Sequence, residues 1–217
     1  MNRRLTVIAV DGPAASGKGT IARALARQFG FDHLDTGLQY RAVGFLVVDA
    51  GHDPADEAAA IHAAKKFRPG LVPEDRLRRD VVIGQAASKV AAIAEVRRIL
   101  QAYQRDFARH PPHGAGAVLD GRDIGTVICP DAGFKIYVTA DVEVRARRRT
   151  LELKSYGMDV TEPQILGELK ERDLRDSSRA TDPLHPAADA TLLDTTHLSI
   201  DAAVASALAA ARQALAH

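Results

Sequence analysis

The segment DGPAASGKGT at residues 11–20 constrains the fold of this chain more than any other. It follows the short apolar run at residues 5–10 and precedes residues 20–29, TIARALARQF, whose apolar side chains recur at helical spacing. A glycine-rich loop between a buried strand and a helix presents successive backbone N–H groups at the positive end of that helix. The sequence therefore predicts a loop that binds a nucleoside triphosphate, within a parallel α/β sheet.

Each kind of residue in this loop has a physical role. Gly12 and Gly17 allow backbone conformations that other residues avoid, and Lys18 supplies a mobile charge for the β and γ phosphates. The usual pattern places Ser or Thr directly after the lysine, whereas here Gly19 intervenes and Thr20 follows. We expect the whole loop to bind the triphosphate, with the Thr20 hydroxyl as a ligand of Mg²⁺: Gly12, Pro13, Ala14, Ala15, Ser16, Gly17, Lys18, Gly19 and Thr20.

Composition excludes several other classes of protein. The chain has 217 residues and a net charge of +1, so one α/β domain is expected, and nothing indicates a nucleic-acid partner. Cys129 is the only cysteine, which rules out an internal disulfide and favours the cytoplasm. No apolar run approaches the roughly 18 residues that a membrane span needs, so we expect no membrane association.

Further apolar runs extend the α/β pattern along the chain. Residues 32–35, 117–120, 134–139 and 190–194 are typical of buried parallel strands, and the alanine-rich residues 201–215 are typical of a final helix. Strands alternating with helices predict a five-stranded parallel sheet with helices on both faces, built as one domain over residues 1–217.

Two segments interrupt this alternation. Residues 42–87 contain several Gly and Pro residues around an alanine-rich stretch, which indicates an insertion with a short helix and loops. Residues 141–180 are densely charged, with RARRR at 145–149, and by themselves are typical of two solvated helix faces.

Several separated motifs, in order, resemble those of bacterial cytidylate kinases, which are nucleoside monophosphate kinases. They are GKGT at 17–20, LDTGLQYR at 34–41, QAASKVAAI at 85–93, LDGRDIGT at 119–126 and ERDLRDSSR at 171–179. A closing segment with DPL at 182–184, AADA at 187–190 and LDTT at 193–196 resembles the same family. The resemblance implies transfer of the γ-phosphoryl group of ATP to CMP, and also to dCMP, with Mg²⁺, in pyrimidine nucleotide metabolism. It also implies that residues 42–87 bind the acceptor and that a lid occupies about residues 145–180.

Transfer of a phosphoryl group between two anions requires positioning and positive charge, and an acceptor monophosphate needs no dedicated base. Arginine forks suit phosphate oxygens. By resemblance, the catalytic residues are Lys18, Arg122 and Arg179. The resemblance places ten residues around CMP: Thr36, Arg41, Ser88, Arg97, Asp120, Arg122, Asp123, Arg172, Asp176 and Arg179.

Within this set, Ser88, Arg97 and Asp123 are implied to contact the base. Serine and arginine can donate to the acceptor atoms of cytosine, and a carboxylate can accept from its amine. Asp120 resembles a carboxylate that holds magnesium through water, but it could equally orient Arg122. At most one or two of the arginines at 145–149 can face a phosphate, because consecutive helical residues point in different directions.

Three other functions compete with this interpretation. Another small P-loop kinase, acting on a different monophosphate or a coenzyme precursor, is the nearest alternative. A GTP-binding switch needs an Asn-Lys-x-Asp motif, and the only asparagine is Asn2. A nucleic-acid-binding protein would need stacking aromatic residues near its arginines, which the sequence lacks. We expect a monomer whose partners are ATP and CMP or dCMP.

Overall fold

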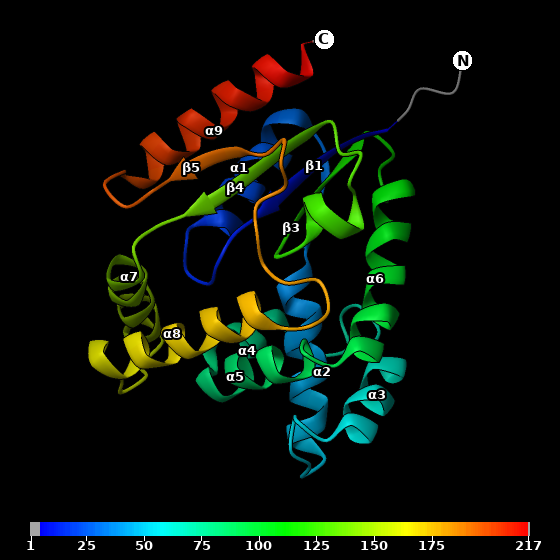
Figure 1. Ribbon diagram of the computed structural model, residues 1–217, viewed down its shortest axis with the longest axis vertical. Helices are drawn as coiled ribbons and strands as arrows, with labels where there is room; N and C mark the ends of the chain where they lie inside the picture. Colours follow the sequence, from blue (N-terminus) through cyan, green and yellow to red (C-terminus); the bar gives the residue numbers. More distant parts are fainter. Residues whose placement is uncertain (1–4, 217) are drawn as a thin grey trace.

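Five parallel strands form the centre of the computed structural model, which describes residues 5–216 (Figure 1). The sheet order is β2-β3-β1-β4-β5, with β1 in the middle. The strands are β1 (Thr6–Asp11), β2 (Asp32–Asp35), β3 (Gly116–Gly121), β4 (Phe134–Thr139) and β5 (Thr191–Asp194). All five strands predicted from the sequence are confirmed, and so is the parallel arrangement.

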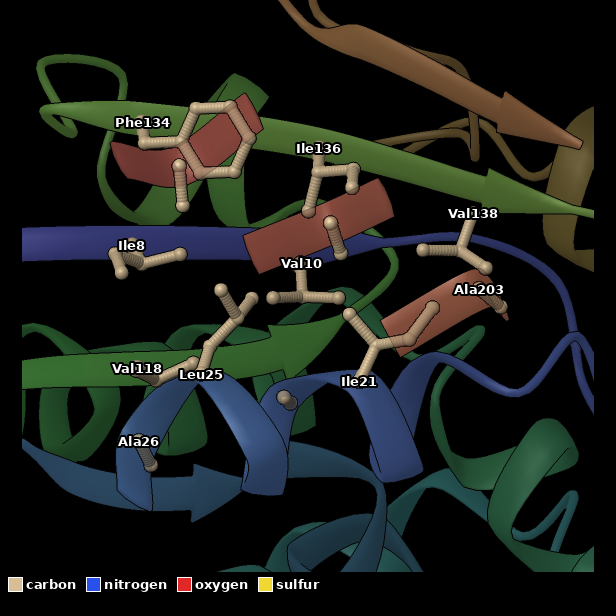
Figure 2. Packing of buried hydrophobic residues seen from close by; sticks show 13 residues of the cluster. Ile8, Val10, Ile21, Leu25, Ala26, Val118, Phe134, Ile136, Val138 and Ala203 are labelled. Atoms are coloured by element: carbon tan, nitrogen blue, oxygen red, sulfur yellow. The ribbon is translucent and has the colours of Figure 1, made fainter. Parts of the chain in front are cut away.

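One face of the sheet is covered by α1 (Lys18–Phe29) and α9 (Ile200–Leu215). Figure 2 shows Ile21 and Leu25 of α1 pointing towards Ile8 and Val10 of β1. These side chains are almost fully buried, because successive strand residues alternate between faces and the apolar stripe of each helix covers one of them. This packing fixes the start of α1 beside the end of β1.

The opposite face packs against α6 (Ala94–Arg109) and the short π-helical turn η1 (Ile124–Ile128). Ala9 of β1 and Leu119 of β3 lie on this face. Cys129 belongs to the same cluster, where burial raises the pKa of its thiol to about 11. The Cys129 side chain therefore packs in this core as a small apolar group.

The segment 42–87 is mostly helical, so the expectation of one short helix and loops was wrong. It contains the end of α2 (Thr36–Asp49), then α3 (Glu57–Lys66), α4 (Glu74–Arg79) and most of α5 (Val81–Val90). The Gly and Pro residues that suggested loops occupy the short turns between these helices. Small side chains of α3 and α5 pack against Tyr40, Val43 and Val47 of α2, which gives this segment a core of its own.

The charged segment 141–180 folds into two helices, α7 (Val142–Ser155) and α8 (Glu162–Ser178), which pack together beside the sheet (Figure 1). Their contact is apolar: Leu153 of α7 meets Ile165 and Leu169 of α8, with Ala14 of the glycine-rich loop against them. Most of the charges lie outside this contact. Within residues 5–216 there is no helix with the length and apolar character needed to cross a membrane.

Candidate active site

The loop after β1 has the strained backbone of an anion-binding turn. Gly12 has a φ of +149°, and a Cβ at this position would lie 2.0 Å from the carbonyl oxygen of Val138 on β4. Ala15 has a φ of +60°, in the left-handed region that non-glycine residues rarely adopt. Such outliers cluster where backbone N–H groups must converge on a ligand. Gly12 is therefore required by close packing as well as by its conformation.

The N-terminus of α1 is left open towards the solvent side of this loop. Gly17 occupies the N-cap position, and among the described residues neither a side-chain cap nor a first-turn acidic residue occupies this end. The first N–H groups of the helix and its dipole are thus available to an anion. Lys18 lies here, with its Nζ 3.2 Å from the carbonyl oxygen of Pro13. Burial, and next the charge of Arg122, lower the pKa of Lys18 to about 7.

A cavity of about 540 Å³ opens over this loop. It is large enough for a nucleotide, and its walls come from the loop, from α2, α4, α7 and α8, and from the start of α9. Its charged lining residues are Lys18, Arg23, Asp35, Arg41, Arg78, Asp120, Arg122, Arg148, Arg149, Glu152 and Arg172. Positive charge predominates in this lining, which makes the cavity a receptor for polyanions.

Three of the arginines expected around CMP reach the cavity from distant parts of the chain. Arg41 comes from α2, Arg122 follows β3, and Arg172 comes from α8. Burial lowers the pKa of Arg41 to about 9, and the neighbouring Arg172 charge adds to this effect. Burial, and next the charge of Arg122, lower the pKa of Arg172 to about 10. These cations repel one another, so an anion between them would be strongly stabilised.

Asp176 and Thr36 orient parts of this cluster. Asp176 accepts a 2.8 Å hydrogen bond from Nε of Arg122, and its carboxylate also lies 3.9 Å from Nε of Arg172. The Thr36 hydroxyl donates to the backbone carbonyl of Asp120 at 2.8 Å. Arg122 is therefore positioned by Asp176, which leaves the Asp120 carboxylate for another role.

The three expected base residues are buried but do not line the cavity. Arg97 is only 1% exposed, and its Nη2 donates a 2.6 Å hydrogen bond to Asp123. The hydroxyl of Ser88, also buried, has no hydrogen-bond partner among the residues that the structure describes. The resemblance implied that Arg97 and Asp123 each contact the base, and in the structure the two are hydrogen-bonded to each other.

Arg179 lies between the base residues and the phosphate cluster. Its pKa is lowered by burial and then by the charge of Arg97, while its Nε donates a 2.7 Å hydrogen bond to the backbone carbonyl of Asp182. Its Nη2 is buried and finds no acceptor within the described chain. Arg179 thus has an unused donor, close to other arginines, that could donate to an oxygen of a nucleotide phosphate.

The Asp120 carboxylate lies next to the end of the glycine-rich loop. Its Oδ2 would be 3.2 Å from a Cβ placed on Gly19, the residue before Thr20. Burial, and next the charge of Asp35, raise the pKa of Asp120, and its Oδ1 lacks a hydrogen-bond partner in residues 5–216. A buried carboxylate with an oxygen that lacks a partner, at the start of the helix that carries Thr20, suits a hydrated Mg²⁺, whose preferred ligands are oxygens.

Among the arginines at 145–149, two line the cavity. They are Arg148, which donates to the hydroxyl and carbonyl of Thr195, and Arg149, which donates at 3.2 Å to the carbonyl of Arg78. Arg145 is instead buried against the loop: its Nη1 donates at 3.2 Å to the carbonyl of Ala14, and its Nη2 bonds to Asp173. The sequence left this choice open, and the structure assigns the cavity to Arg148 and Arg149.

Sequence reasoning missed several charged cavity residues, of which Asp35 and Arg78 are paired with each other. Arg78 lies on α4, and its Nη2 is 2.9 Å from Asp35 Oδ2 at the end of β2. Arg78 belongs to a run of three arginines with Arg76 and Arg79, and no sequence pattern separates it from the others. Asp35 lies within the LDTGLQYR motif, directly before the predicted Thr36, and this neighbour was the one sequence signal that could have identified it.

Comparisons with known proteins give the same picture. The family model described as cytidylate kinase matches residues 8–213. A protein named cytidylate kinase from Rhodospirillum rubrum is 57% identical over 203 residues, covering 93% of this chain and 95% of its own length. One of the same name from Paramagnetospirillum magneticum is 55% identical, covering 94% and 96%. A crystal structure of shikimate kinase from Bacteroides thetaiotaomicron is only 10% identical but superimposes with a TM-score of 0.53, covering 98% of this chain and 99% of its own.

Proposed function

This chain belongs to the cytidylate kinase family, and on that premise we propose that it transfers the γ-phosphoryl group of ATP to CMP, giving CDP and ADP. We extend the proposal to dCMP as a second acceptor. The protein is an ATP-dependent phosphotransferase with the fold of a P-loop kinase. Its monomeric state and its place in the cytoplasm remain predictions from the sequence.

One observation carries the proposal: Lys18, Arg41 and Arg172 meet at one cavity, and all three have lowered pKa values. Bringing two anionic nucleotides together is opposed by their mutual repulsion, and the reacting phosphoryl group spreads its charge over three oxygens. Binding of the phosphate oxygens between these cations lowers the free energy in two ways. It relieves the repulsion among the cations, and it relieves the repulsion between the phosphates of the two nucleotides. This arrangement supports phosphoryl transfer between anions.

We assign the donor phosphates to the glycine-rich loop and the acceptor phosphate to the arginines around it. The loop N–H groups and Lys18 would bind the β and γ phosphates of ATP. Arg41, Arg122 and Arg179 would hold the phosphate of CMP in line for attack, and Arg172 and Asp176 would contact the ribose side, near Thr36. Lys18, Arg122 and Arg179 are the catalytic residues of this proposal, because they would contact the donor and acceptor phosphates between which the transfer takes place.

The base would be bound by Ser88, Arg97 and Asp123. The unpaired Ser88 hydroxyl and the ionised Arg97 can donate to the acceptor atoms of cytosine, and Asp123 can accept from its amine. Since Arg97 and Asp123 lie outside the described cavity, CMP would have to extend from the phosphate cluster into this buried region. A small rearrangement on binding is therefore part of the proposal.

The residues present fit a magnesium ion beside the donor phosphates. The Thr20 hydroxyl and the unpaired Asp120 carboxylate oxygen would hold it, the latter through water. When bound, Mg²⁺ supplies charge neutralisation on the phosphate oxygens.

A panel of acceptors tests the proposed function. Equal concentrations of CMP, dCMP, UMP and AMP are compared with ATP and Mg²⁺ in an assay coupled to ADP formation, with EDTA as the metal-free control. We expect kcat/KM to be highest for CMP, with dCMP next. A kcat/KM for AMP or UMP that is tenfold higher than that for CMP would mean that CMP is not the preferred acceptor.

A further inference from the structure

The loop that follows α8 joins the base arginine to the phosphate arginine through one residue, Asp182. Oδ2 of Asp182 accepts hydrogen bonds from Nε of Arg97 at 3.1 Å and from Nε2 of Gln101 at 2.7 Å. The backbone carbonyl of the same residue accepts from Nε of Arg179 at 2.7 Å. Asp182 therefore contacts both the arginine expected at the base, Arg97, and the arginine expected at the phosphate of CMP, Arg179.

The Asp182 side chain holds Arg97 from the edge that Asp123 leaves free. Asp123 binds Nη2 at 2.6 Å and Asp182 binds Nε, so the guanidinium is fixed in its plane between two carboxylates. Its Nη1 has only a long contact, 3.4 Å, to the carbonyl of Ala91. Two anchored edges leave the remaining N–H groups with a defined direction, which a substrate base can use.

The backbone of Asp182 is in a costly conformation. Its φ of +49° is left-handed, and the next residue is Pro183, which disfavours helical backbone angles at the residue before it. Only Ala15, in the glycine-rich loop, shares a positive φ among the non-glycine residues that the structure describes. Aspartate tolerates this region better than most residues, and the conformation turns its carbonyl towards Arg179 while its carboxylate reaches Arg97.

Gln101 completes the arrangement. Its amide donates to Asp182, and its Oε1 accepts a weaker 3.4 Å contact from Nη2 of Arg105 one turn further along α6. Arg97 and Gln101 are one turn apart on the same helix, so the Asp182 carboxylate bridges them and is fixed relative to α6. The loop after α8 is thereby tied to the helix that supplies the base arginine.

We propose that Asp182 is a positioning residue that couples recognition of the base by Arg97 to alignment of the acceptor phosphate by Arg179. The inference rests on the proposed function of the site. It goes beyond that function because Asp182 and Gln101 touch no expected atom of the substrate. They act through the two arginines.

The test compares Asp182→Gly with Asp182→Asn. Glycine adopts the left-handed backbone freely and removes only the side chain, whereas asparagine keeps an acceptor oxygen for Arg97 and Gln101. We expect Asp182→Gly to raise the KM for CMP about tenfold and to leave the KM for ATP within about twofold. Asp182→Asn should recover most of the loss.

The direction in which the KM for CMP changes distinguishes a positioning role of Asp182 from a purely electrostatic effect of its carboxylate. Removing a carboxylate near an anionic substrate would by itself tighten CMP binding, because it removes repulsion. A structural defect would instead lower activity for CMP and UMP alike. Positioning predicts weaker CMP binding and a fall of about fivefold in the ratio of kcat/KM for CMP over UMP. Asp159→Asn, at an exposed carboxylate on the turn before α8, is the matched control and should change none of these values.

The proposal is overturned if Asp182→Gly keeps either the KM for CMP or the CMP/UMP ratio of kcat/KM within twofold of the parent protein. Gln101→Ala removes the other hydrogen bond that holds the Asp182 carboxylate. It should lower the CMP/UMP ratio of kcat/KM as well, by a smaller factor. The proposed function is judged separately by the acceptor panel on the unaltered chain. If the unaltered chain phosphorylates CMP but the Asp182 variants have the same kinetic constants as the parent, this inference is refuted and the proposed function stands.

Discussion

Nη1 of Arg41 donates a 2.8 Å hydrogen bond to the backbone carbonyl oxygen of Leu77. Arg41 is expected to hold the acceptor phosphate, whereas Leu77 lies on α4 of the segment inserted between β2 and β3. Two further contacts dock α4 on the cavity, from Arg78 to Asp35 and from Arg149 to the carbonyl of Arg78. A phosphate that fixes the Arg41 guanidinium would therefore also fix α4.

This relationship predicts that CMP protects α4 from proteolysis. Arg76 and Arg79 are already exposed, but trypsin cleaves extended backbone, so cleavage at Arg76, Arg78 or Arg79 requires α4 to unwind or undock. We expect saturating CMP to slow cleavage at these sites more than ATP alone does, as measured by mass spectrometry of timed digests. Cytidine, which lacks the phosphate, is the control and should protect weakly. Identical cleavage rates with and without CMP would contradict closure.

Replacing Lys18 by alanine should lower kcat by roughly 10²–10⁴. The ammonium group lies at the open N-terminus of α1, where it can follow the transferring phosphoryl group. Steady-state kinetics with ATP and CMP measure the loss. Retention of kcat within a factor of a few would mean that Lys18 is not at the donor phosphates.

Nucleotide binding should also take up a proton above neutral pH. With a pKa of about 7 in the free protein, Lys18 is mostly neutral at pH 8. Phosphate oxygens favour the charged form and raise this pKa, so binding of Mg·ATP at pH 8 should take up about 0.9 of a proton. Calorimetry in two buffers with different ionisation enthalpies measures this number. Lys18→Arg is charged throughout and should reduce the uptake towards zero; an unchanged uptake would contradict the assignment.

Arg97→Ala should raise the KM for CMP by at least tenfold while the KM for ATP stays nearly constant. Removal of Arg97 leaves the buried Asp123 carboxylate without its partner and removes two donors to the base. Arg98→Ala is the matched control, because Arg98 is the next residue of α6 but is exposed and paired with Glu95. A mutant that loses affinity for ATP and keeps it for CMP would mean that Arg97 contacts ATP, which would contradict its assignment to the CMP base.

Two glycine substitutions should have opposite effects on stability. Gly12→Ala introduces a Cβ 2.0 Å from the Val138 carbonyl at a positive φ and should lower the free energy of unfolding by about 3 kcal/mol or more. Gly167→Ala, in the middle of α8 with open space around the new Cβ, should raise it by about 0.5–1 kcal/mol. Chemical denaturation measures both. A neutral Gly12→Ala would mean that the loop can move away from β4.

The sheet could be predicted from local sequence because its strands are short apolar runs that end at turn residues. The run at residues 134–139 coincides with β4, and residues 32–35 coincide with β2. The insertion was harder, since α3 and α5 present small alanine-rich faces whose core lies against α2, far from any local pattern. Gly and Pro indicated the turns correctly but hid the helices between them.

The candidate site was predictable only as far as its motifs reach. The resemblance named Arg97 and Asp123 separately, and the fold brings them within 2.6 Å. Asp182 begins the closing motif, but the resemblance gave it no role, and it lies 85 residues from Arg97, so only the folded chain shows that the two are in contact. The same holds for Arg78, which the docking of α4 selects from three neighbouring arginines.

The burial of Cys129 makes this chain convenient for fluorescence work. The chain has no other cysteine, and a thiol with a pKa of about 11 and little exposure is mostly protonated and unreactive towards maleimide dyes near neutral pH. A pair of cysteines introduced on exposed positions of α4 and α9 would therefore be labelled without first removing the native one. Energy transfer between those dyes would then follow the opening and closing of the insertion in single molecules during turnover.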